Sequence, residues 1–592
     1  MRELEYPFDG EYILKKSKSI KKQLLADPGS RLPKKIAVLG GSTTHDIIRV
    51  LELFLLNYGI EPVFYESEYG QYWQDAMFDN EELKAFGPDI IYIHTSNRNI
   101  TRYPAAADEP DAVEELKKSQ YEHFESMWER LAAVYHCPII QNNFELPSYR
   151  LMGNAEASLK QGRVRFINEM NLLFADYADR HENFHINDIN YLSAAYGLDK
   201  WSDSFYWHMY KYALSLEAIP TLAFNVAGII KALYGKNKKA LVLDLDNTLW
   251  GGIVGDDGAE NLEIGQETSM GQVYSEFQTY LKAHKDIGVL LNVDSKNDKD
   301  NALAGLNRPD SVLKPEDFIV IRANWEPKSV NLSDIARTLN LGEDSLVFVD
   351  DNPAEREIIR QQNPGVAVPE LDSPEKYIRI LDRSGYFEVT TLNEDDRKRN
   401  EMYRLNVRRE EEKNSFADYG EYLKSLDMKA DIRAFEPMYN ARIAQLTNKS
   451  NQFNLTTKRF TQADIEGFAD NKDYITLYGK LTDKFGDNGV VTVVLARCEG
   501  EIAHIELWLM SCRVLKRDME YAMMDELVRL AALRGVRTLR GYYYKTAKNA
   551  MVRDFYSLHG FECVSTEGED TRWELKVEDY VAKRPSIEVT TD

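Results

Sequence analysis

Two aspartates placed two residues apart, Asp244 and Asp246, directly follow an apolar run at residues 240–243. An apolar run of this length predicts a buried parallel strand, and open α/β sheets carry their chemistry at the carboxyl ends of such strands. Carboxylates in this arrangement can divide the work of group transfer. One attacks or holds a metal ion, and the other gives and takes protons.

Hydroxyl, amide and glycine positions near these aspartates predict an anion site. A second apolar run, 288–293, ends in Asp-Ser-Lys-Asn, which places a hydroxyl, an ammonium and an amide at the end of a predicted strand. Glycines let the backbone approach a bulky anion. The predicted substrate-binding residues are Thr248, Gly251, Gly252, Lys296 and Asn297, and Ser295 is predicted to be catalytic together with Asp244, Asp246 and Lys328.

A cation and two further carboxylates complete the predicted centre. Lys328 stands at a predicted helix start, where a fixed ammonium would neutralise the charge of a phosphate and of a nucleophile. A third apolar run, 345–349, ends in Asp350 and Asp351. Carboxylate and carbonyl oxygens are the ligands that Mg²⁺ prefers, so we expect Mg²⁺ here, with the ligands Asp244, Asp246 (through its carbonyl), Asp350 and Asp351.

The order Asp-x-Asp-x-Thr, Ser295, Lys328 and Asp350-Asp351 resembles the four motifs of the haloacid dehalogenase (HAD) superfamily of phosphoryl-transfer enzymes. The resemblance implies a Rossmann-like parallel sheet, with Asp244 as nucleophile, Asp246 as general acid/base and a Ser295 hydroxyl that binds a phosphoryl oxygen. It also implies phosphatase or mutase chemistry, because ATPases of the superfamily carry Thr at the second aspartate position. Residues 253–285 hold no long insertion, so we expect a minimal cap and an open site for macromolecular or carrier-bound substrates.

Composition predicts a globular chain of several domains. The 592 residues fit roughly three domains of ordinary size. A formal net charge of −23 argues against nucleic-acid and anionic membrane partners. The four cysteines form no Cys-x-x-Cys pair, which suits a reducing cytosol and offers no zinc site. We find no signal region and no 18-residue apolar run, so we expect a cytoplasmic protein.

The first 235 residues alternate apolar strands with helical segments, which is the pattern of an α/β sandwich. They resemble the SGNH (GDSL-like) hydrolase fold, with a Gly-Gly-Ser turn after the first strand. The resemblance implies a nucleophile, an oxyanion donor and a base oriented by a carboxylate, namely Ser42, Asn97, His208 and either Asp203 or Asp188. The alternative is that Ser42 caps a helix and His208 is a packed histidine.

From about residue 430 the pattern changes to paired antiparallel strands, 490–496 and 502–510, with a turn at Glu499-Gly500. With a later helix that ends Tyr-x-x-x-Gly-Phe, it resembles the N-acetyltransferase (GNAT) fold. That family binds the acyl-CoA pyrophosphate through a glycine-rich helix start, but residues 513–518 lack both glycines. A phosphopantetheine arm contacted by Lys516 and Arg517 is one alternative, and a solvated helix start is the other.

The predicted fold class is α/β multidomain. We expect an SGNH-like α/β sandwich at 1–235, a HAD-like Rossmann-like parallel sheet with a minimal cap at 236–385, and a GNAT-like mixed α+β domain at 429–592. Residues 386–428 are predicted to form a charged helical linker, and the dense charges at 394–413 predict a solvated helix.

This domain order, with the polar block QLTNKSNQFNLTT at 445–457 and Ser-Cys-Arg-Val at 511–514, resembles the FkbH-like family over essentially the whole chain. The resemblance implies an enzyme of polyketide and related pathways. Such an enzyme takes the glyceryl group of 1,3-bisphosphoglycerate, removes phosphate and delivers a glyceryl thioester to the phosphopantetheine arm of an acyl carrier protein. Carrier proteins are usually acidic, so we expect a basic landing surface, for which the candidates are Lys449, Lys458, Arg459, Lys516 and Arg517.

One position departs from the family pattern. Many relatives carry Cys before the motif-two Ser, where it can hold an acyl group, whereas Asp294 cannot form a thioester. Either Cys512, next to Arg513, or direct transfer would then serve that step, or the step is lost. Three functions stay open: glyceryl transferase/phosphatase, plain Mg²⁺-dependent phosphatase on a small phosphate, and carrier-binding assembly module.

Overall fold

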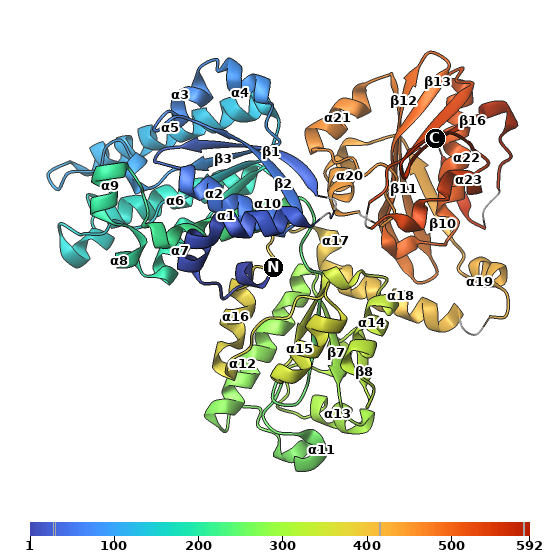
Figure 1. The fold of residues 1–592 in the computed structure, drawn as a ribbon, viewed down its shortest axis with the longest axis horizontal. Coiled ribbons are helices and arrows are strands. Elements are labelled where there is room, and N and C mark those ends of the chain that lie inside the picture. Colours follow the sequence, from blue (N-terminus) through green and yellow to red (C-terminus); the bar gives the residue numbers. More distant parts are fainter. Residues whose placement is uncertain are drawn as a thin grey trace. The chain divides into compact units, whose positions relative to one another are not determined.

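The structure is a computed structural model that describes residues 1–27, 29, 31–413, 416–450, 452–546, 548–583 and 586–591. Asn451 of the polar block and Asn414 and Ser415 of the predicted linker lie outside the described residues. The chain divides into two compact units, Met1–Leu233 and Tyr234–Asp592. In Figure 1 the first unit runs from blue into green and the second from green into red.

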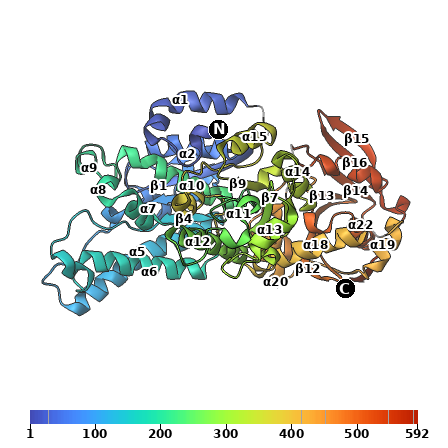
Figure 2. The same cartoon turned by 90° about the horizontal axis from the view of Figure 1, so that it is seen from below.

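The first unit is built on a five-stranded sheet in which every neighbouring pair is parallel. Its order is β2-β1-β3-β4-β5, with β1 (Leu32–Gly40), β2 (Ile60–Glu66), β3 (Ile90–His94), β4 (Ile139–Asn142) and β5 (Phe184–Asn187). Figure 2 shows α1 (Gly10–Ala26) and α2 (His45–Asn57) on one side of this sheet and α5 (Pro110–Tyr135) and α6 (Arg163–Arg180) on the other. Helices on both faces bury β3 and β4 fully, which explains why these two strands lack polar alternation, whereas the edge strand β2 alternates buried and exposed residues.

One helical stretch of this unit corrects an expectation. Residues Leu216–Leu233, which include α10 (Ile219–Leu233), are long and apolar enough to cross a membrane by length and composition. The expectation that no such run exists is therefore wrong. In the structure, 67% of this stretch is buried, and α10 packs against α2. A packed core helix meets the same criterion of length and hydropathy.

The second unit begins with a four-stranded parallel sheet of order β8-β7-β6-β9. The strands are β6 (Ala240–Leu243), β7 (Leu290–Ser295), β8 (Val320–Ala323) and β9 (Leu346–Val349). Alternate residues of β6 pack in opposite directions. One set contacts α12 (Ser269–Ala283) and α13 (Lys299–Leu306), and the other contacts α14 (Lys328–Thr338) and α15 (Pro353–Gln362). Only the short α11 (Val254–Asp257) and η5 (Ala259–Asn261) stand between β6 and α12.

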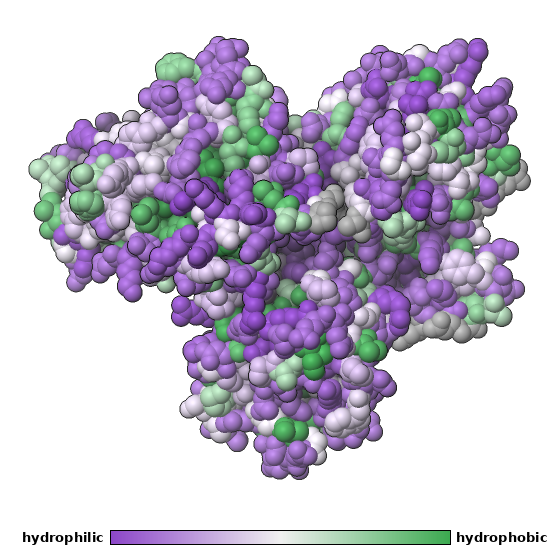
Figure 3. Space-filling view, viewed as in Figure 1, coloured by the Kyte–Doolittle hydropathy of each residue, from purple (hydrophilic) through white to green (hydrophobic). Residues whose placement is uncertain are grey.

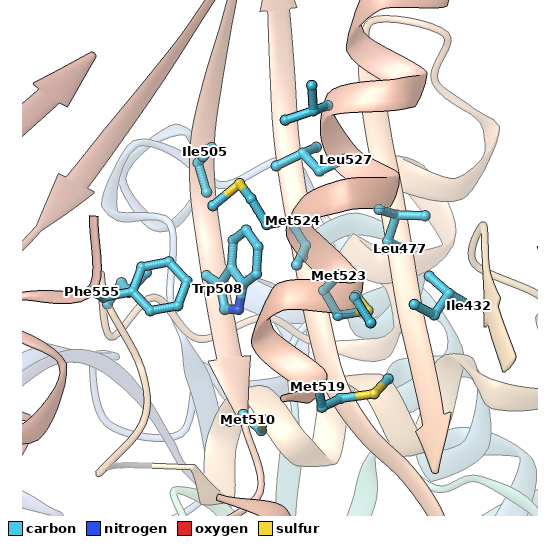
Figure 4. Packing of buried hydrophobic residues seen from close by; sticks show 14 of the residues in the cluster. Ile432, Leu477, Ile505, Trp508, Met510, Met519, Met523, Met524, Leu527 and Phe555 are labelled. Carbon is cyan, nitrogen blue, oxygen red and sulfur yellow. The ribbon is translucent and has the colours of Figure 1, made fainter. Parts of the chain in front are cut away.

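The rest of the second unit forms an eight-stranded mixed sheet of order β15-β16-β14-β13-β12-β11-β10-β17. Its strands are β10 (Lys429–Arg433), β11 (Tyr474–Asp483), β12 (Gly486–Glu499), β13 (Ile502–Met510), β14 (Thr538–Tyr543), β15 (Glu562–Glu567), β16 (Asp570–Lys576) and β17 (Glu588–Thr591). β12 and β13 pair antiparallel, as predicted, whereas β13 and β14 run parallel. Figure 4 shows the methionines of α22 (Met519–Leu533) packed against Trp508 and the strands of this sheet.

The predicted linker is helical but is not simply solvated. It contains α17 (Glu394–Arg397), α18 (Arg399–Lys413) and α19 (Tyr419–Ser425). Tyr403 and Arg409 are buried, and the Arg409 guanidinium lies 2.7 Å from Oδ1 of Asp483. The expectation of a solvated helix is therefore wrong at α18, because some of its charges form internal ion pairs with the mixed sheet.

The surface shown in Figure 3 is mostly hydrophilic, with hydrophobic residues in small scattered groups. This agrees with a charged fraction of 29% in the sequence. Scattered exposed apolar side chains are usual on globular proteins and indicate no particular interface.

Candidate active site

The carboxyl edge of the four-stranded sheet brings three carboxylates and one ammonium together. Asp244 follows β6 and Asp350 follows β9, and both are buried. Lys328 is the first residue of α14, and its Nζ lies 3.0 Å from Oδ2 of Asp244 and 2.5 Å from Oδ2 of Asp350. β6 and β9 are neighbours in a parallel sheet, so their carboxyl ends meet at one place.

The donor set fits a divalent cation that prefers oxygen. Carboxylate oxygens of Asp244, Asp350 and Asp351 lie within 4.8 Å of one another. That span is one that a single oxygen-coordinated cation can bridge, and three carboxylates against one ammonium leave a net negative charge for it to neutralise. These residues would hold Mg²⁺.

The protonation preferences of the cluster follow from burial and mutual charge. Burial lowers the pKa of Lys328, but the charges of Asp244 and Asp350 outweigh burial and raise that pKa well above its usual range. Burial, followed by the charge of Asp244, raises the pKa of Asp350 and of Asp351. Lys328 is therefore a permanent cation, and added positive charge would favour ionised carboxylates.

The Asp246 carboxylate is oriented by three hydrogen-bond donors. Its Oδ1 accepts hydrogen bonds from Nε1 of Trp250 (2.9 Å) and the amide of Val254 (3.0 Å). Its Oδ2 accepts one from Nδ2 of Asn297 (2.8 Å). Asn297 also donates to Oγ of Ser295, so it links the predicted acid/base to the predicted phosphate-binding hydroxyl.

Several predicted substrate-binding residues have structural partners. Thr248 Oγ1 lies 3.2 Å from the Asp351 amide, which donates to it, so this hydroxyl positions the Asp351 loop. Lys296 pairs with Glu355 at 2.6 Å. Gly251 exchanges backbone hydrogen bonds with Glu263, and Gly252 adopts a φ of 100°. The predicted anion-binding roles of Thr248, Gly251 and Gly252 stay predictions, and in this structure the three residues have local hydrogen bonds or turn geometry.

Two residues at this edge, Asn331 and Arg356, were missed from the sequence, and Asp294 was singled out there only because it cannot form a thioester. Asp294 is fully buried, and burial raises its pKa to about 8. Asn331 donates a 3.1 Å hydrogen bond to its Oδ1. Arg356 donates to the backbone carbonyls of Asp350 and Asp351 and fixes their loop. The one available signal was Arg356, a basic residue five positions after Asp351 in a helix that starts at a proline.

The residues predicted to form a hydrolase centre in the first unit are not assembled. Ser42 is buried, and no described hydrogen bond joins its hydroxyl to His208, which is exposed. The Asn97 amide group donates to the carbonyls of Glu145 and Leu146 instead of pointing to an oxyanion. The two candidate carboxylates cap helices: Asp203 caps α9 (Ser204–Tyr210), and Asp188 caps α7 (Ile189–Tyr196).

The alternative roles expected for Ser42 and His208, a helix cap and a packed histidine, are not observed either. The helix that follows Ser42 is α2, and its N-cap position is Thr44, so Ser42 does not cap it. His208 lies on the exposed part of α9 and is not a packed histidine.

Most residues of the expected basic landing surface have partners within the chain. Arg517 is 8% exposed and binds Asp483 and Asn406. Arg459 donates to backbone carbonyls, whereas Lys449 and Lys458 lie 3.6 Å from Asp396 and 3.1 Å from Glu506. Only Lys516 has no described side-chain partner. The prediction of a five-residue surface is therefore wrong at Arg517, which is buried, whereas Lys458 and Lys516 are exposed and the proposed carrier contact stays a prediction.

Cys512 contacts α18, a helix of the region predicted to be a linker. Its Sγ is 3.8 Å from the Tyr403 hydroxyl, and its carbonyl accepts a hydrogen bond from Asn340. The neighbouring Arg513 donates to the Ser511 hydroxyl. No described contact joins Cys512 to Asp244 or Lys328.

Comparisons with known proteins support this picture of the chain. The family model "FkbH, N-terminal domain" matches residues 35–231. The N-terminal part of the protein BF1531 from Bacteroides fragilis, which contains a phosphatase domain and was crystallised with Mg, is 31% identical, with a TM-score of 0.59. The match covers 64% of this chain and 99% of that chain. No curated protein matches the chain.

Acetyltransferases also occur among the similar structures. The ribosomal-protein-S18-alanine N-acetyltransferase from Escherichia coli is 13% identical, covering 26% of this chain and 97% of that chain, with a TM-score of 0.21. A PaiA N-acetyltransferase from Thermoplasma acidophilum, solved with coenzyme A, is 16% identical, covering 25% and 99%, with a TM-score of 0.19. The 31% identity over nearly the whole of the Bacteroides protein and the matched N-terminal family model together show that the chain belongs to the FkbH-like family.

Proposed function

We propose that the chain is a Mg²⁺-dependent phosphoryl-group hydrolase and acyl transferase. In this proposal it converts 1,3-bisphosphoglycerate into a glyceryl thioester on the phosphopantetheine arm of an acyl carrier protein. The observation that carries the proposal is the buried cluster of Asp244, Lys328, Asp350 and Asp351. Support also comes from the similar Bacteroides protein, whose phosphatase domain was crystallised with Mg.

The phosphatase half uses Asp244 and Asp246. An Asp244 oxygen attacks the phosphorus of the phosphate ester, the bond to the sugar-acid oxygen breaks, and Asp246 gives a proton to that oxygen. Asp246 then takes a proton from water, which attacks the phosphorus and releases phosphate and free Asp244. Bound Mg²⁺ would neutralise charge on the transferring group. Lys328 holds the nucleophile in place at 3.0 Å.

The acyl half needs a thiol. The carrier's thiolate attacks the C1 carbonyl of the acyl phosphate, the bond between C1 and the phosphate oxygen breaks, and phosphate leaves. The thiol proton passes to solvent. One bisphosphoglycerate, one thiol and one water then yield one glyceryl thioester and two phosphates.

The test is the intact mass of a purified holo carrier protein after incubation with this chain, Mg²⁺ and 1,3-bisphosphoglycerate. We expect a glyceryl adduct with the wild type and none above background with Asp244→Asn, which should give at most a heavier adduct that still carries phosphate. Phosphate release without any adduct would contradict the transferase half and leave the phosphatase half standing.

A plain phosphatase acting on a small phosphorylated metabolite is the second candidate. One observation favours it: Asp294, a buried carboxyl group beside Ser295, cannot carry an acyl thioester. A carrier-binding assembly module would keep its carrier binding in Asp244→Asn, so the same variant separates it from both enzymes.

A further inference from the structure

The mixed sheet offers one place where a thioester arm would be expected to bind, the gap between β13 and β14. These two parallel strands pair only from Ile502 to Ile505, opposite Thr538 to Gly541. Beyond that point they diverge, and diverging strands expose backbone donors and acceptors to a ligand that can pair with them.

In this chain the gap is filled by residues 453–455 of the polar block. The Leu455 amide donates to the Trp508 carbonyl (3.0 Å), and the Met510 amide donates to the Phe453 carbonyl (3.0 Å). On the other side, the Tyr544 amide donates to the Leu455 carbonyl (2.9 Å). The inserted segment therefore uses backbone groups of both strands.

The segment is also part of the core. Leu455 is fully buried, and the Phe453 ring lies 5.6 Å from that of Phe555. Asn549 donates to the Asn454 carbonyl, and the Thr456 hydroxyl donates to the Glu506 carbonyl. Figure 4 shows Phe555 beside Trp508, and Phe453 contacts the same Phe555 ring. An arm could enter only if this packing were lost.

A groove along α14 has the opposite character. It has a volume of about 520 Å³ and is lined by amides, hydroxyls and one carboxylate between two arginines. Its lining residues are Arg322, Asn324, Ser329, Val330, Asn331, Ser333, Asp334, Arg337, Gln362 and Asn363. Two lining atoms, Oγ of Ser329 and Oδ1 of Asn363, are buried without a described hydrogen-bond partner. Their residues are 5% and 4% exposed.

The charge and the spacing of the groove suit a chain with one anionic end. Arg322 and Arg337 share Asp334, so the three charges sum to one positive charge. The Arg337 side chain is 79% exposed. It stands eight residues beyond Ser329, about 12 Å along the helix. Amides and hydroxyls, which both donate and accept, lie between these positions.

The inner part of the groove reaches the candidate active site through one side chain. Asn331 lines the groove and donates to Asp294, which precedes Ser295. The side chains of Asn324 and Asn331 exchange hydrogen bonds. The backbone N–H of Asn324 donates to the backbone carbonyl of Ser295. Lys328 lies one helical turn before Asn331.

We infer that the groove along α14 receives the phosphopantetheine arm, and that the gap between β13 and β14 does not. The arm's phosphate would lie at Arg322 and Arg337, its amide groups against Asn324, Asn331 and Asn363, and its thiol end toward the candidate active site. This inference rests on the proposed function for the identity of the arm, and the groove supplies the matching chemistry.

The first test measures binding of 4′-phosphopantetheine to the full chain by titration calorimetry. Val330→Trp fills the groove from an exposed position, and Arg337→Glu reverses its outer charge. We expect each to weaken binding at least tenfold. The controls are Val63→Trp, also at an exposed valine, and Arg537→Glu, at an arginine whose side chain is 77% exposed and paired with Glu501. Both should bind as the wild type does.

The second test repeats the carrier mass assay with the same variants. Loss of adduct in Val330→Trp, with phosphate release from a small phosphate ester within twofold of wild type, supports the groove. An adduct rate equal to wild type in Val330→Trp overturns the groove and leaves the proposed function intact. No wild-type binding up to about 5 mM also overturns the groove. Groove-dependent binding without any wild-type adduct supports the groove and contradicts the proposed transferase.

Discussion

Two parallel sheets in this chain both place polar side chains at their carboxyl ends, yet only one of these edges holds opposed charges. In the second unit, Asp244, Asp350 and Asp351 surround a single ammonium, that of Lys328. In the first unit, the corresponding edge carries a buried network of neutral groups, among them Tyr92, His94 and Asn142, which form its neutral edge. The carboxylates at this edge have local partners, because Glu66 accepts from the Thr44 hydroxyl and Asp188 caps α7.

Most groups of the neutral edge pair with one another, whereas Nε2 of His94 and Oγ of Ser42 are buried without a described partner. The Tyr92 hydroxyl donates to Asn142, the Asn142 amide contacts His94, and Asn187 donates to Asn142. Burial lowers the pKa of His94 to about 4, so this ring is uncharged at neutral pH. Buried neutral networks of this kind add rigidity and specificity to a fold.

The difference teaches that position at a sheet edge is not enough for chemistry. The charged edge keeps like charges close together, and its three carboxylates against one ammonium leave two negative charges that a bound divalent cation can balance. Such an arrangement costs stability in the protein alone, so it marks a binding site more strongly than the strand ends do.

The largest effect should come from the nucleophile of the charged edge. Asp244→Asn removes the attacking oxygen, and we expect phosphate release to fall at least ~10³-fold, since a covalent step is lost. The matched change at the neutral edge, Ser42→Ala, should leave release within twofold. A phosphate-release assay on a small phosphate ester compares the two, and a comparable loss in Ser42→Ala would break the contrast between the edges.

The second largest effect should come from Lys328, the ammonium that neutralises part of the carboxylate charge. Lys328→Met leaves Asp244 and Asp350 without their ammonium, so we expect about 3 kcal/mol lower unfolding free energy and a ~10²-fold loss of phosphate release. Urea unfolding in EDTA gives the first quantity. Lys296→Met, at a half-exposed lysine paired with Glu355, is the control and should change stability by less than about 1 kcal/mol. Equal stability of the two variants would contradict the idea that Asp244 and Asp350 repel each other once the Lys328 ammonium is removed.

Asp294 should make stability depend on pH. Folding raises its pKa to about 8, whereas the unfolded carboxyl ionises near 4, so unfolding releases a proton between these values. The free energy of unfolding of the wild type should therefore fall as pH rises from about 4 to 8, on the order of a few kcal/mol relative to Asp294→Asn. Denaturation of both proteins across this range measures the difference. A difference that is constant with pH would show that Asp294 is ionised in the folded state.

The smallest effect should come from the neutral edge. Asn97→Ala removes two hydrogen bonds to the carbonyls of Glu145 and Leu146, and we expect a loss of about 1 kcal/mol in stability. Phosphate release should stay within twofold of wild type. Thermal unfolding with the release assay tests both statements, and a large catalytic loss without a stability change would revive a catalytic role for Asn97.

The strands, the α/β architecture and the family could be predicted from the sequence, because they depend on residues that are close together along the chain. Unbroken apolar runs such as 240–243 indicated strands buried on both faces, and the α/β architecture with parallel sheets is confirmed. The motif order and the polar block also indicated the FkbH-like family, which the comparisons confirm.

The hydrogen-bond and ion-pair partners of individual side chains could not be predicted from the sequence, because these partners lie far apart in the chain. The residues next to Arg517 in the sequence did not indicate that its guanidinium would bind Asp483 and Asn406. The residues next to Thr248 also did not indicate that its hydroxyl would accept a hydrogen bond from the Asp351 amide. Likewise, only the packed sheet decided that residues 453–455 would fill the gap between β13 and β14.

The sequence by itself determined which strands end in carboxylates, because strand burial and chain order are local properties. Tertiary structure alone decided that three of those carboxylates meet one ammonium, whereas Tyr92, His94 and Asn142 of the first sheet hydrogen-bond to one another. The physical reason is that charge and hydrogen bonding act through space. A side chain's role is fixed by the groups that folding brings within a few ångströms of it.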